Sequence, residues 1–248
     1  MTNTVSIPAV PTMDHLFEAG LHYGYSRSRR HPSARPFLFG KKDGTDIFDL
    51  ETTGKALERA AAFVAEVTAA GKQVLFVSGK TEIGRFVREA ADAAEMPFVV
   101  GRWIGGTLTN FEQVQGRISR LIQLRDEREK GELAKYTKRE RLTIDREIES
   151  LEERFGGLVT MRSRPGAVIV IDPKREHIAV AEANATKVPV VALANADCDM
   201  TLISHPIAGN DASVASVELV LKFLSQAAAA GAAVARAAKP AEAAPAQA

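Results

Sequence analysis

The stretch that decides the fold is residues 165–189, PGAVIVIDPKREHIAVAEANATKVP. Its run Val168–Ile171 is uncharged and β-branched throughout, which is typical of a strand that is buried on both faces. A short helix is expected over residues 176–185, and a second apolar run begins at Val190. A buried strand, a helix and another buried strand form the repeating unit of a parallel sheet.

The same alternation runs through much of the chain. Short apolar strands are expected at residues 46–50, 74–77, 98–100, 168–171 and 190–193, and helices at 52–70, 82–95, 176–185 and 211–229. Thr52 or Thr53 is expected to cap the first of these helices. The pattern predicts an open, doubly wound parallel α/β sheet that helices cover on both faces. We assign this sheet domain to residues 46–105 and 158–230.

Residues 106–157 interrupt the alternation, because they contain no strand pattern. Two apolar stripes with spacings of three and four residues, Leu108–Leu121 and Ile144–Phe155, predict an inserted antiparallel helical hairpin, a coiled coil. The segment from Glu112 to Phe155 holds eleven acidic and eleven basic side chains. A solvated pair of helices laced with ion pairs is therefore the favoured interpretation, and an arm that grips RNA is the alternative.

The N-terminal segment, residues 1–45, combines a short helix at 12–20 with an irregular basic loop at 22–45. Six cations stand in this loop against the single acid Asp43: Arg27, Arg29, Arg30, Arg35, Lys41 and Lys42. His31 lies among them, and Tyr23 and Tyr25 are interleaved. Basic side chains contact phosphates and aromatic rings stack on bases, so the loop is a candidate RNA-binding site. A solvated loop without a partner is the alternative.

Composition restricts the function without naming it. A formal net charge of +1 argues against an RNA partner unless the positive charge is concentrated in one place. The single cysteine, Cys198, excludes an internal disulfide and a cysteine-based zinc site. Neither a secretory signal nor a membrane-spanning segment is expected. Residues 231–248, rich in alanine and proline, are expected to form a disordered tail.

Two loops have features of phosphate-binding motifs. Gly79-Lys80-Thr81 follows a strand, but it lacks the earlier glycine of a P-loop. We therefore expect a tight turn, with Thr81 as the cap of the next helix. The glycine-rich loop 101–107 is expected to be a hinge into the helical hairpin, with Thr107 as a cap. Its free backbone N–H groups would also attract phosphate oxygens.

Acidic side chains follow two of the expected strands. Asp172, Asp197 and Asp199 stand where α/β proteins bind ligands, so a small-molecule site stays open. However, no base, nucleophile and orienting group occur together at a recognisable spacing. A lone cysteine such as Cys198, after a buried strand, is usually inert. Neither a catalytic residue nor a metal site is expected.

Four blocks, in order along the chain, resemble the family of bacterial small-subunit ribosomal protein S2. They are LFEAGLHYG at 16–24, GRWIGGTLTNF at 101–111, the stretch at 165–189 and PIAGND at 206–211. The resemblance implies a flavodoxin-like sheet with strand order 2-1-3-4-5 and a protruding coiled-coil hairpin. The chain departs from the family pattern at Tyr25, at Ser33-Ala34 and at Ala212, so a cation bound in the acidic loop near Asp211 is not expected.

The resemblance also implies a function. It implies a structural protein of the cytoplasmic ribosome, between the head and the body of the small subunit, that contacts small-subunit rRNA and helps to dock ribosomal protein S1. It implies no catalysis, cofactor, metal, small-molecule substrate or membrane partner. In the second block, Arg102, Trp103, Thr107 and Asn110 are expected RNA contacts. Trp103 is expected to be a structural residue first, because an aromatic ring beside the Gly105-Gly106 hinge can pin the base of the hairpin to the sheet. A flavodoxin-like enzyme or sensor for a phosphorylated small molecule is the remaining alternative.

Overall fold

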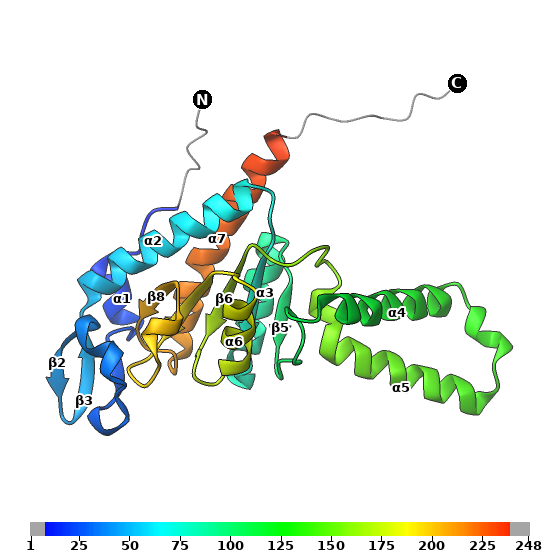
Figure 1. Cartoon of the computed structure of the whole chain (residues 1–248), viewed down its shortest axis with the longest axis horizontal. Coiled ribbons are helices and arrows are strands. Elements are labelled where there is room, and N and C mark those ends of the chain that lie inside the picture. Colours follow the sequence, from blue (N-terminus) through cyan, green and yellow to red (C-terminus); the bar gives the residue numbers. More distant parts are fainter. Residues whose placement is uncertain (1–7, 239–248) are drawn as a thin grey trace.

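The centre of the molecule is a parallel sheet of five strands. The computed structural model describes residues 8–238, and Figure 1 shows the sheet in the middle of the molecule. Its strands are β4 (Val74–Ser78), β5 (Phe98–Val100), β6 (Ala167–Ile171), β7 (Val190–Ala194) and β8 (His205–Ala208), in the spatial order β5-β4-β6-β7-β8. Numbered along the chain, this is the order 2-1-3-4-5, so the expected α/β architecture is confirmed.

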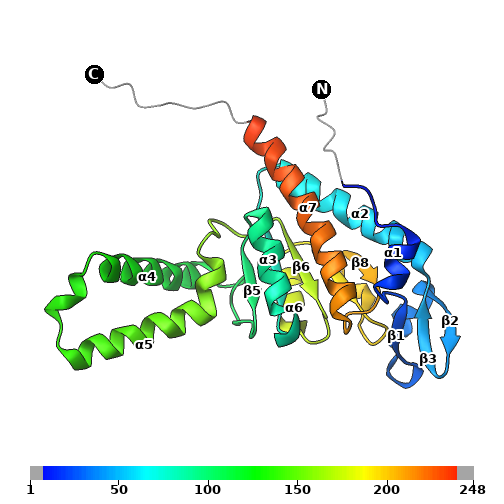
Figure 2. The same cartoon turned by 180° about the vertical axis from the view of Figure 1, so that it is seen from behind.

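Both faces of the sheet are covered, as the uncharged strands predict. Along β6, Val168 and Val170 pack into one hydrophobic cluster and Ile169 and Ile171 into the other, on the opposite face. Three helices lie side by side over the second face in Figure 2: α2 (Leu50–Ala69), α3 (Gly84–Ala94) and α7 (Val214–Ala238). The first face is covered by α6 (His177–Ala185) and by the base of the helical insertion.

Helix α7 is longer than expected. It continues to Ala238, so residues 231–238 are helical and the expected disordered tail does not begin at residue 231; residues 239–248 lie outside the described part. A Cβ atom at Gly231 would stand 2.2 Å from the carbonyl oxygen of Ala65, so glycine allows α7 to cross α2 closely. Length and composition alone would let α7 cross a membrane, but half of its most apolar window is buried inside the protein.

The N-terminal segment forms a second sheet, and here the sequence prediction is wrong. Strand β3 (Thr45–Phe48), expected at 46–50 as part of the α/β domain, pairs antiparallel with β1 (Tyr23–Ser26) and β2 (Leu38–Lys42). The loop at 22–45 is therefore a small sheet rather than irregular chain. Helix α1 (Met13–Glu18) precedes it, and the side chain of Thr12 caps that helix.

The fifth strand of the parallel sheet is β8, which the sequence analysis missed.

Two expected helix caps also differ. Asp49, rather than Thr52 or Thr53, caps α2 by accepting from the backbone N–H of Glu51. Thr81 instead begins a short 3₁₀ helix. The connections contain the 3₁₀ helices η1 (Arg27–Arg29), η2 (Pro32–Phe37), η3 (Thr81–Ile83), η4 (Glu132–Lys135), η5 (Gly156–Leu158) and η6 (Met200–Leu202).

The insertion consists of α4 (Phe111–Glu129) and α5 (Lys138–Phe155), which extend away from the sheet in both views. The two helices contribute buried side chains to the hydrophobic cluster on the first face of the sheet: Val114 and Ile118 from α4, and Ile148 and Leu151 from α5. Arg120 pairs with Glu147 at 3.2 Å, and Arg125 pairs with Glu152. These contacts join α4 to α5.

Candidate nucleic-acid interface

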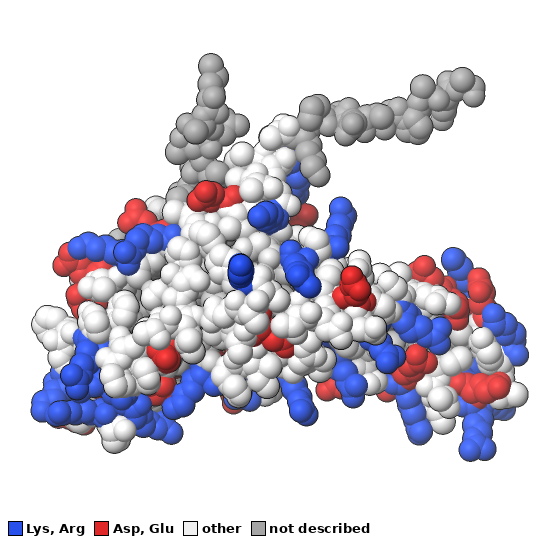
Figure 3. Space-filling model, in the orientation of Figure 1, with Lys and Arg blue, Asp and Glu red and all other residues white. Residues whose placement is uncertain are grey.

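The six cations predicted at 22–45 share one end of the molecule, which we call the basic face. It is the surface of the β1–β3–β2 sheet with η1 and η2, and Figure 3 shows lysine and arginine gathered over this end, at the lower left. Arg30 is partly buried. The other five cations are exposed: Arg27, Arg29, Arg35, Lys41 and Lys42. Phe39, in strand β2, is 82% exposed beside them. The structure therefore concentrates positive charge that the total composition conceals.

Local geometry explains why the cations cluster. Asp43 and Gly44 both have positive φ angles, 50° and 78°, which is the conformation of a two-residue hairpin turn. This turn places Lys42 opposite Thr45 and Lys41 opposite Asp46. The two lysines therefore lie at the tip of a tight hairpin, and the guanidinium of Arg29 lies 5.2 Å from the centre of the Tyr25 ring.

The basic face is anchored to the parallel sheet through backbone groups. The N–H of Tyr25 donates to Oδ1 of Asn195 at 3.0 Å, and the N–H of His31 donates to the carbonyl of Ala196 at 2.8 Å. Ser33 Oγ accepts from the N–H of Met200 at 2.9 Å. These bonds hold the cations in place before any partner arrives, which lowers the entropic cost of binding.

His31, predicted as an RNA contact, belongs partly to this anchor. Its Nδ1 lies 2.8 Å from Ser33 Oγ and 3.8 Å from a carboxylate oxygen of Asp199. The ring is only partly exposed, so it stands at the inner border of the basic face. The sequence analysis did not predict the anchoring role of Asn195 and Ser33, because their partners lie more than 160 residues away along the chain.

The hinge into the insertion, residues 101–110, is organised around Glu182. This carboxylate is 8% exposed and accepts from five donors. Its Oε1 accepts from Trp103 Nε1 (3.1 Å) and the N–H of Gly106 (2.7 Å), and Oε2 accepts from the N–H of Leu108 (3.0 Å) and from the N–H and Oγ1 of Thr109 (both 3.2 Å). Burial alone would raise the pKa of Glu182, but these hydrogen bonds hold it below its usual value.

The hinge geometry corrects several predicted contacts. Trp103 and Thr107 are 6% and 1% exposed, so their side chains do not face a partner. The Oγ1 of Thr107 donates to the carbonyl of Ile104 rather than capping a helix, and α4 begins only at Phe111. The backbone N–H of Gly106, in the loop expected to attract phosphate, already donates to Glu182, as do the N–H groups of Leu108 and Thr109 just after that loop. Arg102 and Asn110 remain exposed.

At the carboxyl edge of the parallel sheet, the protein's own side chains pair around Lys80, beside a hollow of about 410 Å³ that Gly79, Arg102 and Arg175 help to line. Lys80 Nζ lies 2.9 Å from Oδ2 of Asp172 and 2.9 Å from Oδ2 of Asp211. Burial lowers the pKa of Lys80, but the two carboxylates more than offset this and raise it. Asn195 Nδ2 donates to Asp211 Oδ1 at 2.8 Å. Lys80 is therefore already held by two carboxylates of the protein itself.

Glu176 fills the place where a phosphorylated ligand would meet the first parallel strand. Its Oε1 accepts from the N–H of Gly79 at 2.9 Å, and a Cβ atom at Gly79 would stand 2.3 Å from that oxygen. Burial raises the pKa of Glu176. Since a protein carboxylate occupies the backbone donor that follows the strand, this edge does not favour the small-molecule alternative.

The remaining candidates for chemistry are inert. Cys198 is buried, and burial with nearby carboxylates raises its pKa to about 12, so its thiolate is not available near neutral pH. Asp197 pairs with Lys174 at 2.9 Å, and Asp199 accepts from Thr201. Within residues 8–238, no group of three or more His, Cys, Asp and Glu side chains is placed to hold a metal ion.

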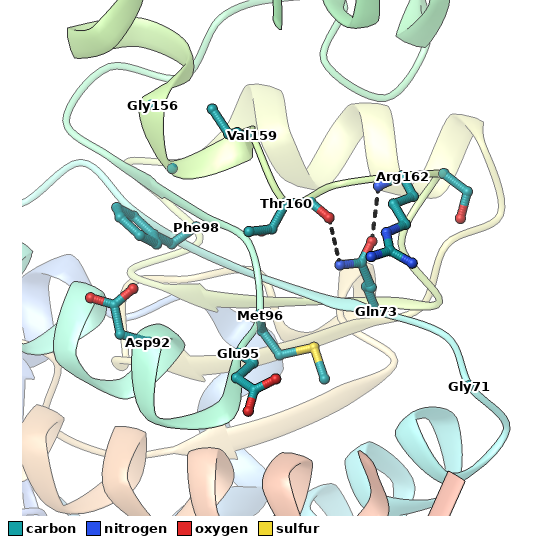
Figure 4. Close-up of a pocket in the computed structure, with 12 residues that line it drawn as sticks. Gly71, Gln73, Asp92, Glu95, Met96, Phe98, Gly156, Val159, Thr160 and Arg162 are labelled. Carbon is teal, nitrogen blue, oxygen red and sulfur yellow. Dashed lines mark hydrogen bonds between the residues drawn. The ribbon is translucent and has the colours of Figure 1, made fainter. Parts of the chain in front are cut away.

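A hollow of about 850 Å³ lies at the amino ends of the strands, between α3 and the base of the insertion. Figure 4 shows the Gln73 side chain joining the carbonyl of Thr160 to the N–H of Arg162, with Asp92 and Glu95 on the opposite wall. These hydrogen bonds fix the chain where it leaves the insertion. The hollow lies opposite the edge at which open α/β sheets bind ligands.

Comparison with known proteins agrees with the resemblance. A family model described as "Ribosomal protein S2" matches residues 16–231. The chain is 41% identical over 217 residues to "Small ribosomal subunit protein uS2" of Roseiflexus castenholzii, covering 88% of this chain and 82% of that protein. It is 36% identical over 228 residues to the protein of the same name from Chloroflexus aggregans, covering 92% and 95%. The protein of that name from Syntrophobacter fumaroxidans is 38% identical over 223 residues, covering 90% and 81%.

Proposed function

The chain belongs to the ribosomal protein S2 family, and on that premise we propose that its basic face binds small-subunit rRNA. Family membership makes it a structural component of the small ribosomal subunit, in the cytoplasmic ribosome, and not an enzyme. The observation that carries the RNA proposal is the concentration of cations on one rigid face of a chain whose formal net charge is only +1.

The cations of the basic face are available to a partner. Arg30 pairs with Asp46 at 3.3 Å, whereas the other five have no ion pair within 4.0 Å in the described part of the chain. When Arg and Lys side chains without ion pairs neutralise phosphates, the cations condensed on the RNA are released. This release supplies much of the affinity for RNA. Phe39 adds an exposed ring beside them, suited to stacking on an unpaired base.

The hinge supplies a second, smaller contact in this proposal. Arg102 and Asn110 are exposed at its two ends, and Glu182 holds the hinge between them. Trp103 and Thr107 support this arrangement from inside and do not touch the RNA.

The position between head and body and the docking of ribosomal protein S1 are also part of the proposal. The family resemblance supports them. Exposed apolar side chains near α1, Met13 (53% exposed), Phe17 (60%) and Tyr23 (48%), supply a surface of the kind that protein partners use.

Co-sedimentation with small subunits tests the role of the basic face. The double variant Arg35→Glu, Lys41→Glu should lose stable association at moderate salt, because each reversal replaces attraction to phosphate by repulsion. A matched control is Lys187→Glu, Lys222→Glu, which changes two exposed lysines outside the basic face by the same charge. Equal loss in both variants, or normal association of the first, would contradict the proposal.

A shortened insertion tests whether the helical arm takes part in docking. Arg120 and Glu147 lie together, so a Gly/Ser linker can replace residues 121–146. Unfolding followed by circular dichroism should remain cooperative, because Phe111, Val114 and Phe155 stay in the cluster that covers the sheet. We expect the variant's occupancy in purified small subunits, and the S1 content of those subunits, to fall. Full occupancy and full S1 content would remove the arm from the proposal.

A further inference from the structure

The basic face contains a hollow of about 250 Å³ in which its cations converge. Four positive side chains and one carboxylate line it, with two small or apolar residues: Arg27, Arg30, Arg35, Leu38, Gly40, Lys41 and Asp46. The hollow is smaller than sites that enclose a drug-sized molecule, roughly 300–1,000 Å³. Its size suits one charged group rather than a whole small-molecule ligand.

Separate elements bring these side chains together. Arg27 lies in η1, Arg30 follows that turn and Arg35 lies in η2. Lys41 comes from β2, and Asp46 stands opposite it in the register of β3. Like charges brought this close repel one another unless a partner of opposite charge is present, and the single acid of the hollow does not balance four cations.

Asp46 is the unusual member of the hollow. Its side chain is 1% exposed, and its Oδ1 lies 3.3 Å from Nη1 of Arg30. Its Oδ2 is buried and has no hydrogen-bond partner among residues 8–238. A buried carboxylate oxygen without a donor is unfavourable, so its position needs an explanation. In the described chain, the hydrogen bond that the Asp46 carboxylate accepts comes from Arg30 and not from a backbone N–H. Its negative charge therefore acts mainly on the Arg30 guanidinium.

Arg30 keeps most of its donors free. A guanidinium carries five N–H groups in a fixed plane, and the hydrogen bond to Asp46 takes one of them. The Arg30 side chain is 20% exposed and lines the hollow. With one edge fixed by a carboxylate, the plane of the guanidinium is oriented, and such a plane matches the paired oxygens of a phosphate.

We propose, building on the RNA-binding role proposed above, that this hollow seats one phosphodiester group of the rRNA backbone, and that Asp46 is the positioning residue that orients Arg30 toward it. The phosphate supplies the negative charge that the four cations lack. Asp46 improves binding although it carries the same sign of charge as RNA. A surface that acts through net charge alone would bind RNA more tightly without that acid.

The proposal is testable because removing the negative charge of Asp46 should weaken RNA binding, whereas removing that of Asp43 should not. The full-length chain is titrated against small-subunit rRNA transcribed in vitro, with excess tRNA as competitor. Asp46→Asn should weaken binding about tenfold, the equivalent of one charge-assisted hydrogen bond. The matched control is Asp43→Asn, which removes the same charge from the exposed tip of the β2–β3 turn, where asparagine tolerates the positive φ. It should bind as tightly as the wild type or more tightly.

A second variant keeps the test decisive if Asp46→Asn does not fold, as judged by the loss of a cooperative melt. Arg30→Lys preserves the charge but not the planar fork, so binding should again weaken about tenfold, with an unchanged salt slope. If Asp46→Asn tightens binding as Asp43→Asn does, or if Arg30→Lys binds like the wild type, the seat for a phosphate is wrong while RNA binding by the basic face stands. If the wild-type chain prefers rRNA no more than tRNA, the RNA-binding proposal itself fails.

Discussion

The hinge and the basic face each contain a buried carboxylate, and the two carboxylates do opposite things. Glu182 in the hinge accepts from five donors. Within the described residues, Asp46 in the basic face has one side-chain partner, Arg30, and one oxygen without a donor. Three backbone N–H groups of the hinge are thereby unavailable to an anion, whereas the basic face keeps five cations without ion pairs in the described chain.

This difference shows what decides whether a loop rich in hydrogen-bond donors is free to bind a phosphate of a partner. Both loops were predicted to contact phosphate, one from its glycines and backbone N–H groups and one from its cations. In the hinge, Glu182, which is far away along the chain, accepts from these donors, and Trp103 and Thr107 are buried. In the basic face, the single buried acid Asp46 pairs with Arg30 and cannot neutralise the other cations of the surface.

The largest expected effect comes from removing each carboxylate in turn. Glu182→Ala leaves several buried donors unpaired at once, and the free energy of unfolding should fall by on the order of 5 kcal/mol. Asp46→Ala removes one ion pair and an unsatisfied oxygen, and the loss should be about 1–2 kcal/mol. Chemical denaturation followed by circular dichroism measures both. Equal losses would break the contrast between the two sites.

Trp103 should give the next largest effect, because its buried indole N–H joins the hinge to Glu182. Trp103→Ala removes a buried ring and should lower the free energy of unfolding by about 3 kcal/mol. Trp103→Phe keeps much of the ring but loses the indole N–H, and should lower it by about 1 kcal/mol. If the free protein tolerates Trp103→Ala but assembly into subunits fails, Trp103 is a contact with the ribosome instead of part of the hinge.

The sequence was sufficient for the parts of the fold that depend on local pattern. The uncharged runs of β4, β6 and β7 identify buried strands, because such runs have few other stable environments. The strand order came from the family resemblance and not from the pattern itself. Strand β8 was missed because His205 and Pro206 interrupt its apolar run, and β2 was missed because its residues, LFGKK, are largely exposed and show no alternation.

The candidate site was predictable only in part. The cations of the basic face are visible in the sequence, because six of them stand within 22–45 against one acid. The role of Glu182 is not visible, since its donors lie 73 to 79 residues away along the chain. Whether a polar group is free or already satisfied is a property of tertiary pairing, and the sequence analysis therefore included Trp103 and Thr107 among the RNA contacts.

A smaller effect should appear in the pH dependence of stability. The folded pKa of Glu182 lies below its ordinary value of 4.5, so its ionised form stabilises the native state. This contribution is fully present above the unfolded pKa and is lost as the pH falls through the folded pKa. The wild type should therefore lose stability below about pH 4.5, and Glu182→Gln should lose less over the same range. Parallel pH profiles of the two proteins would mean that Glu182 is not ionised in the hinge.

The smallest expected effect is that of Arg29, and it is the cleanest test of whether the cations of the basic face are free. Arg29 is exposed and has no ion pair in the described chain, and its guanidinium lies over the Tyr25 ring. Arg29→Ala should leave the melting temperature unchanged, because surface substitutions away from specific contacts stay within about 0.5 kcal/mol. The slope of the logarithm of RNA affinity against the logarithm of salt concentration should decrease by about one, the value for one lost phosphate contact. Lys222→Ala, an exposed lysine on α7, should leave that slope unaltered. If Arg29→Ala also leaves it unaltered, the guanidinium stays with the Tyr25 ring in the complex, and the available charge of the basic face is reduced to the cations that line the hollow and to Lys42.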